Sequence, residues 1–212
     1  MSPRVSMAEA VREVARRDSA LADVIRRSPP IRLRGTRDES GHFADLVESI
    51  MYQQLAGKAA AAIHGRFVTA VGGVVAPEAV LATPEATIRA AGVSGAKAAA
   101  VRDLSAKVLD GTVPFEGIGR LSDDEIVERL VQVRGIGRWT AEMFLIFRLR
   151  RLDVWPVDDL GVRAGWAIAH GLPANPTPKA LEAEGDRFRP FRTVAAYYCW
   201  EAVHLSRASQ TR

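Results

Sequence analysis

The chain has 212 residues, of which 48% are hydrophobic and 25% are charged, and its net charge is +4. A chain of this length and composition can bury a sizeable core, which excludes an intrinsically disordered protein. Its single cysteine, Cys199, excludes an internal disulfide and a four-cysteine iron–sulfur cluster, and it is interpreted as a small core residue.

The first part of the chain shows helical periodicity and no targeting signal. Apolar residues recur through residues 8–27 in two sets on either side of Asp18, which predicts two short helices or one kinked helix ending before Pro29. This segment has no apolar run suited to a signal peptide, and no stretch of the chain reaches the ~20 apolar residues of a membrane span. We therefore expect a cytoplasmic protein with no membrane partner.

Two helices separated by a short polar loop come next. The spacing of apolar residues predicts helices over residues 42–51 and 57–71. The loop between them places two amides beside an aliphatic side chain, with Gln54 next to Leu55. By composition alone this segment is typical of an ordinary surface loop.

Three shorter signals lead to the centre of the chain. Residues 77–81 predict a short helix, and Thr83-Pro84 predicts the start of another, with Thr83 as its N-cap and Pro84 at its first position. Residues 92–95 form a glycine turn before a helix over residues 97–109. This turn has no G-x-G at the helix start, so we interpret it as structural.

A capping box and a glycine turn mark the central stretch. Ser122 and Glu125 form an S-x-x-E box, which predicts a helix over about residues 123–131. Gly135-Ile136-Gly137 then predicts a tight turn with Ile136 in the core, and a second helix should begin at once, with no breaker before Asp153.

This turn can bind an anion. A helix that starts behind a glycine turn presents unpaired N–H groups and the positive end of its dipole, and Arg138 adds a full charge there. Residues 1–133 balance 17 basic against 17 acidic side chains, whereas residues 134–212 carry 12 against 8, so the net positive charge begins at this turn. A plain helical hairpin closed by glycines fits the tripeptide equally well.

Two adjacent carboxylates follow the second helix. Asp159 lies 20 residues after Trp139, which is enough for a helix and a returning loop. Asp158 and Asp159 both precede an apolar run, where either can cap the next helix. Both cannot occupy one cap, so one carboxylate is left without a structural role.

The last part of the chain adds two helices, over residues 178–188 and 193–205, joined by the sequence F-R-P-F-R. No strand-rich segment, internal repeat or low-complexity tract is present in the sequence. The pattern as a whole is typical of an all-α protein.

The segments V-R-G-I-G-R-W-T-A and P-V-D-D-L-G-V-R resemble the signature of the helix-hairpin-helix DNA glycosylase superfamily. The resemblance covers about residues 40–206 and is closest to the 3-methyladenine DNA glycosylase II (AlkA-type) branch in its compact, all-helical form. It implies a two-lobed all-α fold with the active-site cleft between the lobes. One lobe would comprise residues 40–154 and the other residues 1–39 with 155–212.

The resemblance also implies roles for single residues. It makes Asp159 the catalytic carboxylate and leaves Asp158 as the candidate cap. The base pocket would be lined by Trp139 and Trp200, and by Met143 and Leu160 where the family pocket offers tyrosines. Residues implied in DNA binding are Gly135, Gly137, Arg138 and Thr140 at the phosphate, and Gln54 and Leu55, which would fill the space left by an extruded base.

The implied activity is base excision repair: hydrolysis of the N-glycosidic bond of alkylated purines, of the 3-methyladenine and 7-methylguanine type, in double-stranded DNA. Trp139 stands where strand-cleaving relatives have a lysine, and because tryptophan forms no Schiff base, a monofunctional enzyme is expected. The expected protein is a monomer that requires no cofactor, although the family hairpin implies Na⁺ or K⁺ on the backbone carbonyls of Val131, Val133 and Ile136.

Two alternatives stay open at this point. One is a bifunctional glycosylase/lyase for oxidised bases. The other is a non-catalytic helix-hairpin-helix DNA-binding protein, in which Asp158 and Asp159 serve only as caps.

Overall fold

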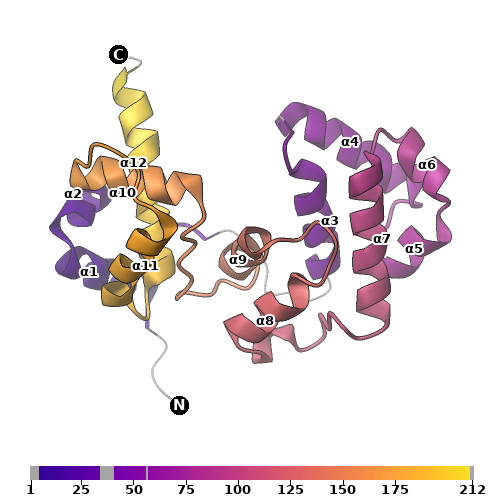
Figure 1. Cartoon of the computed structure of the whole chain (residues 1–212), viewed down its shortest axis with the longest axis horizontal. Coiled ribbons are helices and arrows are strands. Elements are labelled where there is room, and N and C mark those ends of the chain that lie inside the picture. The colour runs from indigo at the N-terminus through magenta and orange to yellow at the C-terminus, as the bar shows by residue number, and fades with distance from the viewer. Residues whose placement is uncertain (1–4, 34–40, 56, 211–212) are drawn as a thin grey trace. The chain divides into compact units, whose positions relative to one another are not determined.

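The computed structural model describes residues 5–33, 41–55 and 57–210, and this part of the chain contains helices and no strand (Figure 1). The expected all-α fold is therefore confirmed. None of the described helices is long and apolar enough to cross a membrane. The elements are α1 (Met7–Arg17), α2 (Ser19–Arg27), α3 (His42–Tyr52), α4 (Gly57–Ala70), α5 (Pro77–Ala82), α6 (Glu85–Ala90), α7 (Gly95–Leu109), η2 (Ile118–Arg120), α8 (Asp123–Leu130), α9 (Arg138–Phe147), α10 (Leu160–His170), α11 (Pro178–Gly185), η3 (Asp186–Phe188) and α12 (Arg192–Gln210).

The described residues form two compact units. One unit is drawn from residues 1–34 and 150–212, and the other from residues 35–149. In the first unit the indigo helices α1 and α2 pack against the orange and yellow helices α10 and α12, so the two ends of the chain share one core (Figure 1). The boundaries lie at 34/35 and 149/150, compared with 39/40 and 154/155 in the division implied by the sequence resemblance.

Asp18 separates the first two helices and fastens them to the rest of their unit. Its backbone is extended, and its Oδ1 accepts the N–H of Leu21 at 2.9 Å, so it ends α1 and caps α2. Its Oδ2 lies 3.0 Å from Nε2 of His170 and 2.9 Å from a guanidinium nitrogen of Arg187. Of the two arrangements expected around Asp18, two short helices or one kinked helix, the structure has two short helices.

These contacts favour the cationic form of His170. Its Nδ1 lies 2.9 Å from the carbonyl oxygen of Trp166 and its Nε2 lies 3.0 Å from the Asp18 carboxylate, and because both partners are acceptors, a proton on each ring nitrogen satisfies both contacts. Burial disfavours the charged ring, but the hydrogen bonds to Asp18 and to the Trp166 carbonyl outweigh it and raise the pKa of His170.

The stability of the protein should therefore depend on pH through His170. A raised folded-state pKa contributes stability that is fully present below the unfolded value of about 6.5 and is lost as the pH rises through the folded value. His170→Gln should lower the free energy of unfolding at pH 6 by about 1 to 2 kcal/mol, because one hydrogen bond to a charged group is lost from a partly exposed site. Urea unfolding between pH 5.5 and 8.5 measures both effects, and an unchanged pH profile in the variant would contradict the assignment.

The capping box of α8 forms as predicted. Ser122 Oγ accepts the N–H of Glu125 at 3.2 Å, and the Glu125 carboxylate accepts the N–H of Ser122 at 2.8 Å. The box closes the first turn of α8, which ends at Leu130.

Several helix boundaries differ from the sequence predictions, among them the ends of α12, which runs from Arg192 to Gln210 and not over residues 193–205, and three others differ for reasons that the contacts show. Thr83 does not cap α6: its hydroxyl donates to the carbonyl of Ala79 at 2.8 Å, and Pro84 with φ −56° and ψ 139° occupies the N-cap. Helix α9 stops at Phe147 because the N–H groups of residues 148 and 149 both donate to the Phe144 carbonyl, and Arg150 then turns the chain with φ +54°. The predicted helix over residues 178–188 is α-helical to Gly185 and continues as the 3-10 turn η3.

Candidate active site

The hairpin between α8 and α9 has the backbone that its glycines allow. Gly135 has φ +77°, and a Cβ there would lie 3.2 Å from Cβ of Ala100 on α7, so the position favours glycine on both counts. Ile136 is buried, as predicted, and anchors the turn. Gly137 is extended and forms the N-cap of α9.

The N-cap of α9 offers no side chain of its own to the first turn of the helix. The N-cap of α9 is Gly137, which has no side chain to cap the helix, whereas Ser122 caps α8 with its hydroxyl. A Cβ at Gly137 would meet nothing within 4 Å, so there is space beside the N-cap at the positive end of the α9 dipole.

Arg138 adds less free charge than its position predicts. Its Nε lies 3.0 Å from Oε1 of Glu142, a buried carboxylate one turn along α9, while the Arg138 side chain is largely exposed. The spacing of four residues was visible in the sequence and would have revealed this pair. Arg138 thus pairs with the buried Glu142 and still exposes most of its side chain to solvent.

The loop after α3 exposes the two side chains that were predicted to enter DNA. Gln54 has φ +56° and is exposed, and Leu55 is 39% exposed at the next position. The N–H of Leu55 donates to the Tyr52 carbonyl at 3.4 Å, which closes a tight turn. Ala56, the next residue, lies outside the described residues.

Gln53 is a site residue that the sequence predictions missed. Its Nε2 donates to the carbonyl of Gly135 at 3.2 Å and to Oγ1 of the buried Thr140 at 3.4 Å. The loop after α3 and the hairpin are therefore in contact. The sequence held no signal that separates Gln53 from Gln54, because the partners of Gln53 lie more than 80 residues away.

Trp139 and Met143 line two neighbouring pockets along α9. Trp139 is 43% exposed and borders a pocket of about 420 Å³, whereas Met143 borders one of about 320 Å³. Ser49, Tyr52 and Thr140 line both pockets, so the two lie side by side. The Trp139 pocket has aromatic side chains next to hydroxyl and amide groups, a lining found in small-molecule sites, whereas the Met143 pocket also has Asp45, Glu48 and Arg148 in its lining.

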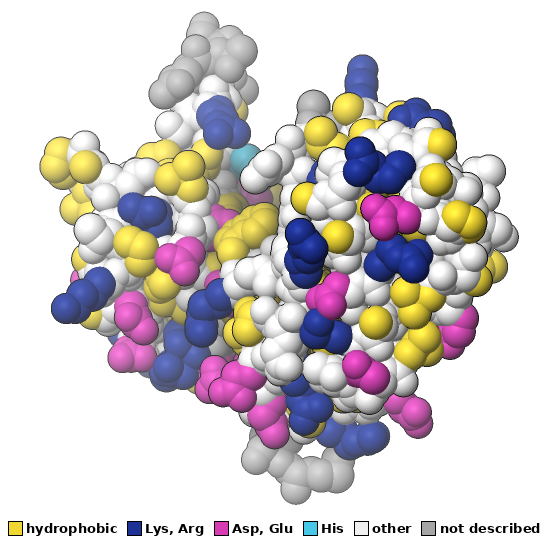
Figure 2. Space-filling model, turned by 45° about the vertical axis from the view of Figure 1, so that its right-hand side comes forward, with side chains coloured by type: hydrophobic (Ala, Val, Ile, Leu, Met, Phe, Trp, Pro, Cys, Tyr) yellow, Lys and Arg dark blue, Asp and Glu magenta, His cyan; other side chains and the backbone are white. Residues whose placement is uncertain are grey.

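Lys and Arg side chains do not gather into one patch on the face shown in Figure 2, where they alternate with Asp and Glu. A broad basic surface is therefore not what would hold an anionic polymer on this face. The N-terminal end of α9, behind the glycine turn, is the more specific candidate.

In the other unit, Asp159 caps α10 with its own carboxylate. Its Oδ1 accepts the N–H of Val162 at 2.7 Å and Nε1–H of Trp200 at 2.8 Å, and the residue is 8% exposed. Asp158 is exposed and does not cap the helix, so the expectation that Asp158 is the cap was wrong. The physical reason is that Asp159 occupies the N-cap position directly before Leu160, from which its carboxylate reaches the N–H of Val162.

Two glycines on α10 let Trp200 reach Asp159. A Cβ at Gly165 would lie 1.7 Å from the carbonyl oxygen of Cys199, so the backbones of α10 and α12 touch at this point. A Cβ at Gly161 would lie 2.8 Å from Cδ1 of Trp200. Cys199 is fully buried, which confirms it as a core residue, and burial raises the pKa of its thiol.

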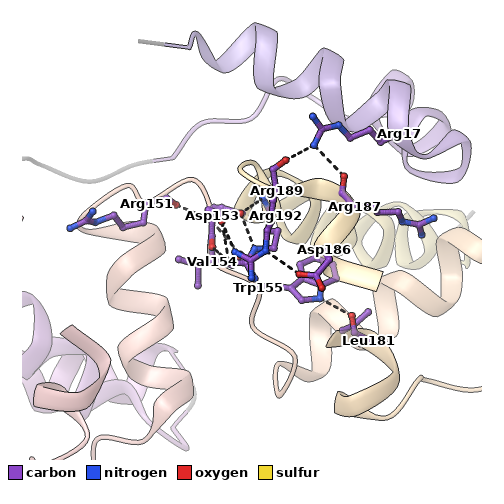
Figure 3. A network of polar contacts seen from close by, with 11 residues as sticks. Arg17, Arg151, Asp153, Val154, Trp155, Leu181, Asp186, Arg187, Arg189 and Arg192 are labelled. Atoms are coloured by element: carbon purple, nitrogen blue, oxygen red, sulfur yellow. Dashed lines mark hydrogen bonds and ion pairs between the residues drawn. The ribbon is translucent and has the colours of Figure 1, made fainter. Parts of the chain in front are cut away.

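The loop that leads to Asp159 is fastened to the start of α12. The carboxylate of Asp153 accepts from Arg192 at 2.8 Å and from Arg189 at 3.1 Å (Figure 3). Thr193 Oγ1 accepts the N–H of Val154 at 3.0 Å, and Trp155 Nε1 donates to a carbonyl of α11 at 2.8 Å. The F-R-P-F-R link supplies both arginines, so it positions the approach to Asp159.

Residues 47–190 match the family described as HhH-GPD superfamily base excision DNA repair protein. The chain belongs to the HhH-GPD superfamily. The match includes the hairpin, the loop after α3 and Asp159, which are the parts of the candidate site described above.

Relatives of this HhH-GPD protein agree with the assignment. DNA-3-methyladenine glycosylase 1 of Schizosaccharomyces pombe is 39% identical over 167 residues, which cover 77% of this chain and 73% of that protein. The structure of the S. pombe 3-methyladenine DNA glycosylase in complex with abasic DNA is similar with a TM-score of 0.75 and 34% identity, over 91% of this chain and 95% of that one. The crystal structure of a DNA-3-methyladenine glycosidase from Bacillus halodurans is similar with a TM-score of 0.82 and 34% identity, over 91% and 88%.

The residues singled out in the sequence of this HhH-GPD protein fall into two groups. One group lies together in the unit of residues 35–149: Gln54, Leu55, Val131, Val133, Gly135, Ile136, Gly137, Arg138, Trp139, Thr140 and Met143. The other group lies in the second unit: Asp159, Leu160 and Trp200. Leu160 is 66% exposed in the first turn of α10, directly after Asp159.

Proposed function

We propose that this protein is a monofunctional DNA glycosylase that hydrolyses the N-glycosidic bond of alkylated purines in double-stranded DNA, as a step of base excision repair. The observation that carries the proposal is the placement of Asp159, a nearly buried carboxylate whose Oδ1 is fixed by a backbone N–H and by Trp200. The DNA-3-methyladenine glycosylase relatives support the alkylated purine as substrate.

The chemistry of an alkylated purine fits this site. Such a base is cationic or leaves readily, so the barrier lies in the oxocarbenium-like sugar and not in protonation of the leaving group. Asp159 supplies negative charge beside the sugar and orients or deprotonates the attacking water. Trp200, whose Nε1 donates to Asp159, would stack on the flipped base, an interaction of about 0.5 to 2 kcal/mol for a cation over an indole.

Trp139 also argues for hydrolysis without strand cleavage. A lyase step needs an amine that attacks the sugar carbon, and an indole cannot form that bond. Trp139 occupies the second position of α9, beside the phosphate-binding turn. The product is therefore an intact strand with an abasic site.

Methylated duplex DNA tests the proposal. The purified protein should release methylated purines, identified by chromatography, and leave the strand uncut until alkali is added. Borohydride should trap no covalent protein–DNA adduct. A trapped adduct would establish a lyase, whereas DNA binding without base release would establish a non-catalytic binding protein.

DNA binding at the hairpin can be tested with one position. Gly137→Asp should weaken binding to all DNA sequences about 10-fold or more, because the new carboxylate caps α9 and puts negative charge where a phosphate would bind. The fold should survive, since a side chain at this position meets nothing within 4 Å. Fluorescence anisotropy at low salt measures the affinity.

Gly137→Asn is the matched control for that substitution. Asparagine caps the helix equally well but adds no charge, so it should weaken binding less than aspartate does. If the wild type, Gly137→Asp and Gly137→Asn bound DNA with equal affinity, the hairpin would not be part of the DNA interface.

The exposed Leu55 is proposed to fill the space left by the flipped nucleotide, with Gln54 beside it. Leu55→Ala should slow excision from fully paired duplex about 10-fold, but slow excision opposite a gap by less than about twofold, because extrusion is easier there. Single-turnover rates on the two substrates measure this ratio. Equal slowing on both would show that Leu55 only packs within the protein.

A monovalent cation at the hairpin is a further part of the proposal. The carbonyls of Val131, Val133 and Ile136 would hold Na⁺ or K⁺, and oxygen ligands of this kind suit hard cations. The Val133 carbonyl already accepts the N–H of Ile136 at 3.0 Å, which leaves its second lone pair for an ion. The bound ion would add positive charge near the phosphate. A monomeric state and a cytoplasmic location stay predictions from the sequence.

A further inference from the structure

Gln53 joins the loop that carries Leu55 to the hairpin that is proposed to hold DNA. Its amide donates to the carbonyl of Gly135 in the turn and to the hydroxyl of Thr140 in the first turn of α9. One side chain thus contacts both halves of the hairpin. Its own backbone ends α3, with its N–H donating to the Ile50 carbonyl at 3.4 Å.

Lys97 fixes the backbone at the same point. Its Nζ, which comes from α7, donates to the carbonyls of Met51 at 2.7 Å and Gln53 at 2.9 Å. These carbonyls stand at the C-terminal end of α3, where the helix has unpaired acceptors and the negative end of its dipole. Burial lowers the pKa of Lys97, in line with an ammonium group that is partly withdrawn from water.

The residue after this fixed point is in a costly conformation. Gln54 has φ +56°, which a residue with a side chain adopts at a cost of order 1 kcal/mol unless its surroundings enforce it. Leu55 follows directly and projects from the turn with 39% of its surface exposed. The direction of Leu55 therefore depends on how firmly Gln53 is held.

A side chain that enters the base stack, as proposed for Leu55, must be held in place while the bases separate. Unstacking one base step costs a few kcal/mol, so a loop that is not fixed to the rest of the protein would move aside and leave the bases stacked. The contacts of Gln53 link the loop to the turn proposed to grip the phosphate, and the contacts of Lys97 link it to α7.

We propose that Gln53, with its backbone held by Lys97, is a positioning residue that braces Leu55 against the hairpin. It acts through Leu55 and touches no reacting atom. This inference rests on the proposed glycosylase function and on the proposed insertion of Leu55, and it adds how insertion is coupled to the grip on the phosphate.

Two variants remove the brace in different ways. Gln53→Leu keeps a similar volume without the amide, and Lys97→Met removes the bonds to the two carbonyls. Each variant should slow single-turnover excision from fully paired duplex about 10-fold, which corresponds to roughly one lost hydrogen bond. Each should slow excision of a base opposite a gap by less than about twofold. Lys107→Met is the matched control: it removes one charge from the same helix, where Nζ pairs with Asp103, and both rates should stay within about twofold of wild type.

A double variant separates positioning from a merely structural role. If Gln53 acts through Leu55, Gln53→Leu combined with Leu55→Ala should slow excision from paired duplex no more than Leu55→Ala alone. Multiplicative slowing, or equal slowing of the Gln53→Leu variant on paired and gapped substrates, would overturn the inference. A wild-type protein that releases no base from either substrate would overturn the proposed function and this inference together.

Discussion

Asp159→Asn should lower the rate of base release at least ~100-fold, equivalent to about 2.7 kcal/mol of transition-state stabilisation, while binding to damaged DNA persists. Asparagine can accept the N–H groups of Val162 and Trp200 through the same oxygen, and it is as good an N-cap as aspartate. The helix start and the position of Trp200 should therefore be kept, and only the negative charge is lost. Single-turnover excision, anisotropy with damaged duplex and thermal unfolding measure the three quantities.

Asp158→Asn is the matched control for this charge. The residue is adjacent, carries the same group and is exposed, and it does not cap α10, so its substitution should change rate and stability very little. An inactive Asp158→Asn with an active Asp159→Asn would show that the catalytic role belongs to the other carboxylate. If both variants stayed active, the proposed enzyme would lack its central group.

Gly165→Ala should lower the free energy of unfolding by about 3 kcal/mol or more, at the upper end of the cost of overpacking. The new Cβ would lie 1.7 Å from the carbonyl oxygen of Cys199, a backbone atom that cannot rotate aside, so α10 and α12 would have to separate. In a protein of this size the melting temperature should fall by roughly 6 to 12 °C. Urea and thermal unfolding measure the change.

Gly65→Ala provides the comparison. Gly65 lies within α4, and a Cβ there would meet nothing within 4 Å. This substitution should raise stability by about 0.5 to 1 kcal/mol, because alanine loses less backbone entropy on entering a helix. If Gly165→Ala were equally harmless, the close contact between α10 and α12 would be wrong.

Local signals in the sequence predicted much of the fold. The capping box of Ser122 and Glu125 and the break at Asp18 both act within a few residues, so the sequence alone locates them. Thr83 shows where such signals fail. A threonine between two short helices can serve the end of one or the start of the other, and here its hydroxyl closes α5.

The sequence predicted those parts of the candidate site that depend on the backbone conformation of a single residue type. The hairpin glycines are of this kind, since positive φ and the absence of a side chain follow from the residue type. The choice between Asp158 and Asp159 is different, because either can cap a helix and the decisive partner, Trp200, lies 41 residues away. Only the family resemblance linked that tryptophan to the site.

The division of the chain between its two units has a consequence for its synthesis. Residues 35–149 form one continuous unit, whereas α1 and α2 pack against α10 and α12. At about 5 to 20 residues per second, the stretch between Arg27 and Arg192 takes roughly 10 to 30 s to translate. During that time the faces of α1 and α2 that pack against α10 and α12 wait for these helices, so α1 and α2 complete their packing after residues 35–149 have been made.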